Sequence, residues 1–138
     1  MTKRFVVTVD GPAGSGKSTV CRLLARELAC VYLDTGALYR AVALKVSRAG
    51  LAPADRAGIA ALCAETAVAL AVREGDTRVL LDGQDVTEHI RTPAISMLAS
   101  TISAVPEVRQ RLLAVQREAV PAGGIVAEGR DMGTVVFP

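Results

Sequence analysis

A glycine-rich segment near the N-terminus constrains the fold of this chain more than any other feature. Gly11 to Ser18 has the sequence GPAGSGKS, which fits the spacing G-x-x-x-x-G-K-[ST]. An apolar run at residues 5–9 precedes it and predicts a buried strand, and a helix is predicted over residues 18–28. A glycine-rich turn between strand and helix directs successive backbone N–H groups to one place, where the helix N-terminus adds partial positive charge. The sequence therefore predicts a site for nucleotide phosphates at this turn.

Each part of this motif has a physical role. The glycines let the backbone approach a phosphate closely, Lys17 reaches the β- and γ-phosphates, and the Ser18 hydroxyl can bind Mg²⁺. The ordinary alternative is a glycine-rich turn that happens to contain lysine and serine. That alternative does not explain why a strand, the turn and a helix follow one another in this order, so we favour the phosphate site.

The composition indicates one globular domain with no nucleic-acid and no membrane partner. Of the 138 residues, 51% are hydrophobic and 22% are charged. The net charge of +2 gives no reason to expect nucleic-acid binding, and 3% aromatic residues without Trp argue against a base-stacking surface. No apolar stretch approaches the ~20 residues that span a bilayer, and nothing resembles a signal peptide.

The cysteines predict free thiols in a reducing compartment. Cys21, Cys30 and Cys63 are odd in number and lack the C-x-x-C spacing of a zinc site or a redox pair. Free thiols favour a cytoplasmic location. We expect the single histidine, His89, to be a surface residue rather than a ligand or a base.

The first part of the chain alternates strands and helices. Residues 31–33 form a short apolar run that predicts a strand, which Asp34-Thr35-Gly36 ends. Helices are predicted over residues 37–49 and, from an alanine-rich periodic pattern, over residues 53–70. The resulting order β-α-β-α-α favours a parallel sheet with crossover helices.

The middle of the chain changes character and reads as an insertion between the second and third strands of an α/β core. Residues 68–73 and 78–81 suggest a small antiparallel hairpin, and Asp82-Gly83 predicts a second turn. A capping residue and prolines predict two further helices, one from Thr92-Pro93 to about residue 103 and one from Pro106 to about residue 120. The short apolar run at residues 125–127 predicts another buried strand.

The expected fold class is α/β. We predict a three-layer α/β/α parallel sheet of the P-loop NTPase type, incomplete because only its first three core strands are present, with an inserted small α+β substrate-binding lobe. The expected organisation is one incomplete domain, with a core at residues 1–52 and 122–138 and the lobe at residues 53–121.

Four segments together resemble the bacterial cytidylate (CMP/dCMP) kinases, a family of P-loop nucleoside monophosphate kinases. They are the phosphate loop, LDTGALYR at residues 33–40, IRT at residues 90–92 and GRDMGT at residues 129–134. The resemblance covers essentially the whole chain, and the four segments are far more specific than any one alone. It implies transfer of the ATP γ-phosphoryl group to CMP or dCMP, which gives the diphosphate and ADP.

The resemblance also implies roles for individual residues. Lys17 and Arg130 would be catalytic, and Mg²⁺, which accompanies ATP, would be held by Ser18 and, through water, by Glu128. Arg40 and Arg130 would clamp the phosphate of the acceptor. ATP would be bound by Gly11, Pro12, Ala13, Gly14, Ser15, Gly16, Lys17, Ser18 and Thr19. CMP would be bound by Thr35, Arg40, Ser100, Arg109, Arg130 and Asp131.

The residue types suit this chemistry. Cytosine offers an N4 donor beside the N3 and O2 acceptors, so the implied readers Ser100, Arg109 and Asp131 are complementary to its edge. Ordinary explanations exist for the same residues. Arg40 and Arg109 would be exposed helix arginines, Ser100 an unremarkable hydroxyl, and Arg130 with Asp131 a local ion pair of little energetic value.

Members of the family continue beyond the last segment, with two more core strands and an arginine-bearing lid over ATP. Without them, we expect residues 5–9 to form an open apolar edge that favours self-association, although the family is usually monomeric. An alternative function is therefore a catalytically impaired nucleotide-binding fragment. A GTPase switch is disfavoured because no N-K-x-D segment is present. Other small-molecule kinases, such as shikimate or gluconate kinases, would give no reason for a cytosine-reading set.

Overall fold

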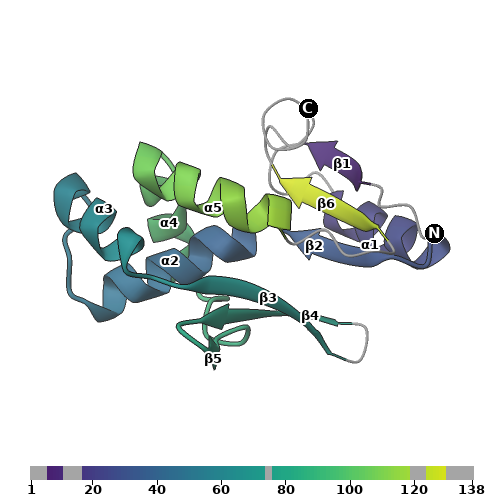
Figure 1. The fold of residues 1–138 in the computed structure, drawn as a ribbon, viewed down its shortest axis with the longest axis horizontal. Coiled ribbons are helices and arrows are strands. Elements are labelled where there is room, and N and C mark those ends of the chain that lie inside the picture. Colours follow the sequence, from purple (N-terminus) through teal and green to yellow (C-terminus); the bar gives the residue numbers. More distant parts are fainter. Residues whose placement is uncertain (1–5, 11–16, 74–75, 119–123, 130–138) are drawn as a thin grey trace. The chain divides into compact units, whose positions relative to one another are not determined.

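The computed structural model describes residues 6–10, 17–73, 76–118 and 124–129 (Figure 1). These residues group into two compact units, described separately here. The first lies within Met1–Thr35, Val72–Thr77 and Gln116–Pro138, and the second within Gly36–Ala71 and Arg78–Val115. The elements in chain order are β1 (Val6–Asp10), α1 (Lys17–Glu27), β2 (Val31–Asp34), α2 (Gly36–Arg48), α3 (Arg56–Ala64), β3 (Val68–Arg73), β4 (Asp76–Leu81), β5 (Gln84–Asp85), α4 (Pro93–Ile102), α5 (Pro106–Glu118) and β6 (Ile125–Gly129).

The first unit contains a parallel sheet in the order β1-β6-β2. Strand β6 pairs with β1 from Val6↔Ile125 to Asp10↔Gly129, and with β2 from Val31↔Ile125 to Asp34↔Glu128. All of β6 up to Glu128 is buried, as expected of a central strand in a parallel sheet. The predicted α/β class, with a parallel sheet and crossover helices, is confirmed. The strands at the sheet edges, in the described part of the chain, are β1 and β2; self-association through β1 stays a prediction.

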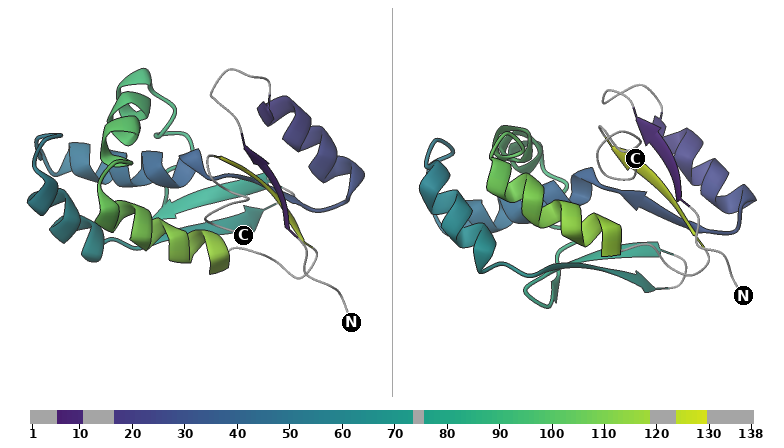
Figure 2. Two further views of the ribbon diagram at one scale, coloured as in Figure 1. Left: turned by 90° about the horizontal axis from the view of Figure 1, so that it is seen from above. Right: turned by 45° about the horizontal axis from the view of Figure 1, so that its top comes forward.

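Helix α1 packs against this sheet (Figure 2), and small side chains lie at the contact. Cys21 and Ala25 are buried and form a cluster with Val126 of the central strand. Small residues at positions i and i+4 share one face of a helix, so the helix can approach the strand closely. The Arg22 guanidinium lies over the ring of Tyr32, 5.4 Å from its centroid, which ties α1 to β2 by a cation–π contact.

The second unit is built around a helical core to which the small sheet β3-β4-β5 contributes. Helices α2 and α4 pack against each other through side chains that recur at helical spacing. The sheet adds Val79 and Leu81 to the same core. The largest fully buried side chains of this unit are Leu38, Val42, Val46, Ile59, Val86, Ile90, Ile102, Val108 and Leu112.

The helix predicted over residues 53–70 is wrong in its extent. Helix α3 ends at Ala64, and strand β3 begins at Val68. Its N-terminus is capped by Asp55, whose Oδ1 accepts from Gly58 N at 2.9 Å. The alanine-rich pattern favours a helix throughout, but Ala67 O instead accepts from Asp82 N at 2.7 Å. Pairing with a distant segment therefore overrides local helix propensity.

The Asp82-Gly83 turn between β4 and β5 is confirmed. Both residues have positive φ, +49° and +85°, which is the backbone of a two-residue type I′ hairpin turn. Asp82 has two partners, since Lys45 Nζ forms an ion pair with its Oδ2 and Ala67 N donates to its Oδ1 at 2.9 Å. Arg48 of α2 also donates to the Gln84 amide oxygen at 3.2 Å. The C-terminal end of α2 is thus fastened to the hairpin.

The compact units divide the chain after Thr35, so α2 belongs to the second unit. The predicted substrate-binding lobe begins only at residue 53. The extent of the lobe, residues 53–121, stays a prediction.

We expect the second unit to lose stability as the pH falls below about 4. The Lys45 ammonium, and to a smaller extent the Ala67 N–H, lower the pKa of the Asp82 carboxyl. A carboxyl group with a lowered pKa in the folded state stabilises the fold above its unfolded pKa of about 3.9. That stabilisation is lost as the pH falls toward the folded value.

The measurement is the Tm of the chain and of Asp82→Asn at pH 7 and pH 3. Asparagine tolerates the left-handed backbone of this turn, so the substitution removes the charge and keeps the turn. The variant should have a lower Tm at pH 7, and the difference should shrink at pH 3. An equal difference at both pH values would contradict the assignment.

Candidate nucleotide-binding site

The carboxyl edge of the parallel sheet is where the glycine motif begins. Strand β1 ends at Asp10, the motif occupies residues 11–16, and α1 starts at Lys17. The predicted strand before the motif and the predicted helix after it are therefore confirmed, whereas the turn itself lies outside the described residues. Ligands of open α/β sheets bind outside the carboxyl ends of the strands, and a helix N-terminus favours anions. The structure thus places the start of α1 as the phosphate prediction requires.

The predicted ATP-binding residues are described only in part. Gly11, Pro12, Ala13, Gly14, Ser15 and Gly16 lie outside the described residues. Lys17 and Ser18 form the start of α1, and Thr19 in its first turn is exposed. The roles of these residues in binding ATP stay predictions.

Thr35 joins the ends of β2 and β6. Its Oγ1 donates to the Glu128 carbonyl oxygen at 2.8 Å, and its backbone N donates to the same oxygen at 3.1 Å. Thr35 is buried at 4% exposure, so both hydrogen bonds lie away from solvent. Its hydroxyl proton is used within the protein, so toward a ligand this oxygen can act only as an acceptor, through its two lone pairs. The structure shows a role for Thr35 in the sheet, and its contact with CMP stays a prediction.

Glu128 occupies the middle of the carboxyl edge. It lies on the central strand, is the register partner of Val9 and of Asp34, and is only 3% exposed. Burying a carboxylate costs free energy unless polar or charged groups compensate it. In the described ranges, no group of three or more His, Cys, Asp or Glu side chains is placed to hold a metal ion. Glu128 as one ligand is compatible with a cation that keeps most of its water ligands.

Three of the predicted acceptor residues belong to the second unit. Arg40 lies on α2 and is half-buried, whereas Ser100 on α4 and Arg109 on α5 are exposed. Because α2 and α4 pack together, the structure brings the helices of Arg40 and Ser100 side by side. Arg130 and Asp131 lie outside the described residues, so whether they meet the other three is not tested.

The hydroxyl groups of α4 and of the residue after it differ in their partners. Thr101 donates to the Met97 carbonyl at 3.2 Å, and Ser103 donates to the Ser100 carbonyl at 2.7 Å. A hydroxyl that donates to a carbonyl one turn back along the helix cannot donate the same proton to a ligand. The structure gives no such bond from the Ser100 hydroxyl to another described residue, which suits its predicted role as a base reader.

No role in this site was predicted for the cysteines or the histidine. Cys21, Cys30 and Cys63 are free thiols. Burial raises the pKa of the Cys30 and Cys63 thiols, and a raised pKa disfavours the reactive thiolate. His89 is exposed, as predicted.

Sequence reasoning missed a polar network around Asp85 and Thr87, which follows the Asp82-Gly83 turn. Asp85 Oδ1 accepts from Thr87 N at 3.0 Å and from Thr87 Oγ1 at 2.7 Å. The pattern Asp-x-Thr after a strand is a signal for such a side-chain turn. The network leads directly into the IRT segment at residues 90–92, for which no role had been predicted.

None of the helices in the described ranges combines the length and the apolar character that crossing a membrane requires.

Comparison with known families decides which family the chain belongs to. A family model described as cytidylate kinase matches residues 7–138. This chain belongs to the cytidylate kinase family. The resemblance inferred from the four sequence segments is confirmed.

Curated relatives agree with this result. A cytidylate kinase of Pelotomaculum thermopropionicum is 56% identical over 133 residues, which cover 96% of this chain and 59% of the relative. Cytidylate kinases of Symbiobacterium thermophilum and Geobacter sulfurreducens are 52% and 53% identical, with 99% and 97% of this chain and 61% and 58% of the relatives covered. The chain therefore spans about three fifths of the length of these relatives.

We predict that Thr35→Val weakens the sheet by about 1 kcal/mol, because it removes one buried hydrogen bond to the Glu128 carbonyl and leaves the backbone bond in place. Thr35→Ser keeps the hydroxyl and should lose much less. The measurement is the free energy of unfolding from denaturant titration, with amide exchange of β6 as a local readout. Equal losses in the two variants would show that the hydroxyl does not join the strands.

Proposed function

We propose that this chain carries the donor and acceptor residues of an ATP-dependent kinase that acts on CMP or dCMP. The γ-phosphoryl group of ATP passes to the phosphate of the acceptor, giving CDP or dCDP and ADP. The observation that carries the proposal is the family match over residues 7–138, together with a strand, glycine motif and helix at the carboxyl edge of the sheet. The named relatives are cytidylate kinases.

On the donor side, backbone amides of residues 11–16 and the N-terminus of α1 would bind the phosphates of ATP. Lys17 would neutralise charge on the β- and γ-phosphates. The residues fit a magnesium ion bound with ATP. Ser18, in the first turn of α1, would supply a hydroxyl ligand, and the buried Glu128 carboxylate would bind the ion through water. When bound, Mg²⁺ supplies positive charge at the phosphates.

On the acceptor side, Arg40 and Arg130 would hold the acceptor phosphate, because a guanidinium binds phosphate oxygens in pairs. Ser100, Arg109 and Asp131 would read the cytosine edge. A base lacking the matching groups would leave these polar side chains unpaired, and this supports discrimination against other nucleotides. The placement of Arg40 and Ser100 on packed helices supports a shared acceptor site.

The chemistry requires alignment more than covalent participation. An oxygen of the acceptor phosphate attacks the γ-phosphorus while the bond from that phosphorus to the bridging oxygen of ADP breaks. Lys17 and Arg130 would reduce the repulsion between the two anionic nucleotides and the charge that develops during transfer. The acceptor-binding side chains would hold the attacking oxygen in line, and this alignment contributes to the acceleration together with the charge stabilisation.

The proposed partners are small molecules, ATP and CMP or dCMP, and no nucleic acid or membrane is proposed. A cytoplasmic location is supported by the three free cysteines, which suit a reducing compartment.

Lys17→Ala should lower ATP-dependent phosphorylation of CMP by at least about 100-fold, because it removes a cation from the transferred group. The measurement is ADP formation with CMP in a coupled assay. Arg56→Ala is the matched control, since it removes one exposed positive charge from α3. Equal rates in both variants would contradict the role of Lys17. If the unsubstituted chain binds both nucleotides without turnover, the impaired-fragment alternative is correct.

Asp131→Ala should weaken CMP binding by about 10- to 100-fold and leave ATP binding within about twofold, because it removes a charged partner of the cytosine N4 group. Titration calorimetry with each nucleotide measures both affinities. Glu118→Ala, which removes an exposed carboxylate from α5, serves as the control. Equal weakening of ATP and CMP would argue against a base-reading role.

A further inference from the structure

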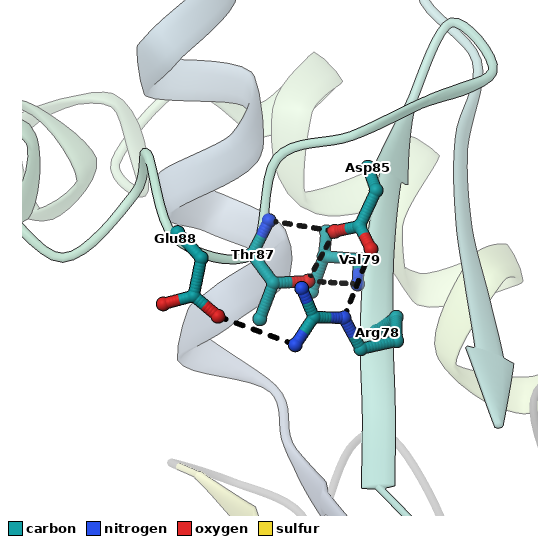
Figure 3. A network of polar contacts seen from close by, with 5 residues as sticks. All are labelled: Arg78, Val79, Asp85, Thr87 and Glu88. Atoms are coloured by element: carbon teal, nitrogen blue, oxygen red, sulfur yellow. Dashed lines mark hydrogen bonds and ion pairs between the residues drawn. The ribbon is translucent and has the colours of Figure 1, made fainter. Parts of the chain in front are cut away.

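The strand pairing of β4 continues beyond β5 through a side chain (Figure 3). The register of β4 and β5 ends at Leu80↔Asp85, and Val86 N then donates to Val79 O at 2.9 Å. In a regular antiparallel pair, Val79 N would donate to Val86 O. It donates instead to Thr87 Oγ1, at 2.9 Å. The Thr87 hydroxyl therefore takes the place of a backbone carbonyl.

This replacement changes the direction of the chain. The Val86 carbonyl, released from the strand pairing, accepts from His89 N at 2.8 Å and closes a turn. Thr87 is 7% exposed, so an unpaired Val79 N–H at this place would be costly. The hydroxyl thus ends the strand and permits the turn without leaving a backbone donor unpaired.

Two charged residues hold the Thr87 side chain in this position. Asp85 Oδ1 accepts from the Thr87 hydroxyl at 2.7 Å, and Arg78 Nε donates to Asp85 Oδ2 at 2.9 Å. Arg78 also donates to Glu88 Oε1 at 3.2 Å. The Arg78 guanidinium, with help from Thr87, keeps the pKa of the Asp85 carboxyl well below its usual range. Asp85 therefore stays an acceptor, and the Thr87 hydroxyl is oriented from both sides.

The network fixes the segment that leads into α4. Three residues after Thr87, Ile90 is buried at 2% exposure. Thr92 then caps α4, with its Oγ1 accepting from Ile95 N at 3.2 Å. The IRT segment at residues 90–92 is consequently held by the network on one side and by the helix cap on the other. The start of α4 is tied to β4.

Helix α4 carries Ser100 and packs against α2, which carries Arg40. A helix is stiff over ten residues, so a shift at its start would move Ser100 as well. Hydrogen bonding to a base depends steeply on distance and angle. A fixed start of α4 therefore bears on how the acceptor base is held.

We propose that Thr87 and Asp85 are positioning residues for the acceptor nucleotide, which fix the IRT segment and α4 so that Ser100 meets the base of a pyrimidine nucleoside monophosphate. This inference rests on the proposed function. Neither residue contacts the nucleotide in this proposal; both act through α4.

The test compares Thr87→Val with Thr87→Ser. Valine keeps the size of the side chain and removes the hydroxyl, whereas serine keeps the hydroxyl. Titration calorimetry should show CMP binding about tenfold weaker in Thr87→Val, with ATP binding within about twofold of the unsubstituted chain. Thr87→Ser should bind both nucleotides nearly as the unsubstituted chain does.

Thr66→Val is the matched control for a purely structural effect. Thr66 is a buried threonine of the same unit, and its hydroxyl donates to Leu62 O at 2.6 Å. Its loss should lower the Tm without changing the ratio of CMP to ATP affinity. If Thr87→Val changes the Tm alone and keeps that ratio, the residue has only a structural role and the inference is wrong.

Amide hydrogen exchange without nucleotide provides an independent readout. In Thr87→Val, exchange should become faster at Val79 and in residues 89–96, while α3 keeps its protection. Unchanged exchange in residues 89–96 would overturn the inference even if CMP binding fell. If the unsubstituted chain does not bind CMP although exchange changes as expected in Thr87→Val, the proposed function is wrong. The role of Thr87 in acceptor binding is then wrong as well.

Discussion

The pairing of β6 between β1 and β2 is the constraint on which the rest of the structure depends. The last strand of the described residues lies between the first two, and its register aligns Asp10 with Gly129 and Asp34 with Glu128. Parallel pairing brings all three carboxyl ends to one edge. The chain therefore leaves the sheet at neighbouring points after Asp10, where the glycine motif begins, after Asp34, where Thr35 follows, and after Gly129. Segments more than ninety residues apart can serve one site because of this single arrangement.

The second unit depends on polar side chains placed where regular structure ends. Asp82 pairs with the end of α2, Thr87 replaces a carbonyl of the strand pairing, and Thr92 caps α4. Each of these side chains satisfies a backbone donor that would otherwise lose its partner. Apolar burial holds the helices together, but it is non-directional. The hydrogen bonds supply the direction in which each helix and turn starts.

The sequence predicted what local chemistry determines. Asp82-Gly83 and Thr92-Pro93 were interpreted correctly because turn and cap preferences depend on a few adjacent residues. The predicted end of the helix at residue 70 was wrong because Ala67 pairs with Asp82, which lies far along the chain. The pattern Asp-x-Thr signals a local turn at Thr87, but it does not reveal that the Thr87 hydroxyl accepts from Val79 of β4, which depends on the pairing of the strands. The central position of β6 likewise depends on pairing between distant segments. For the site, the motifs indicated the family, whereas the contacts of the site residues depend on packing that motifs do not contain.

The two proposed nucleotide subsites also differ in what would hold them. The phosphates of ATP would be bound largely by backbone amides, whose positions follow from a strand, a turn and a helix, so a short motif suffices to predict them. The acceptor base would be read by side chains from separate segments, Ser100 on α4, Arg109 on α5 and Asp131 beyond β6 in the sequence. No short motif encodes their relative placement. The base selectivity of these side chains depends on how firmly the elements that carry them are held. A displaced hydroxyl forms a weaker hydrogen bond with the correct base and therefore discriminates less against a wrong one. Under the proposed function, residues that anchor α4 therefore belong to base selection although they lie outside the set of base-contacting side chains.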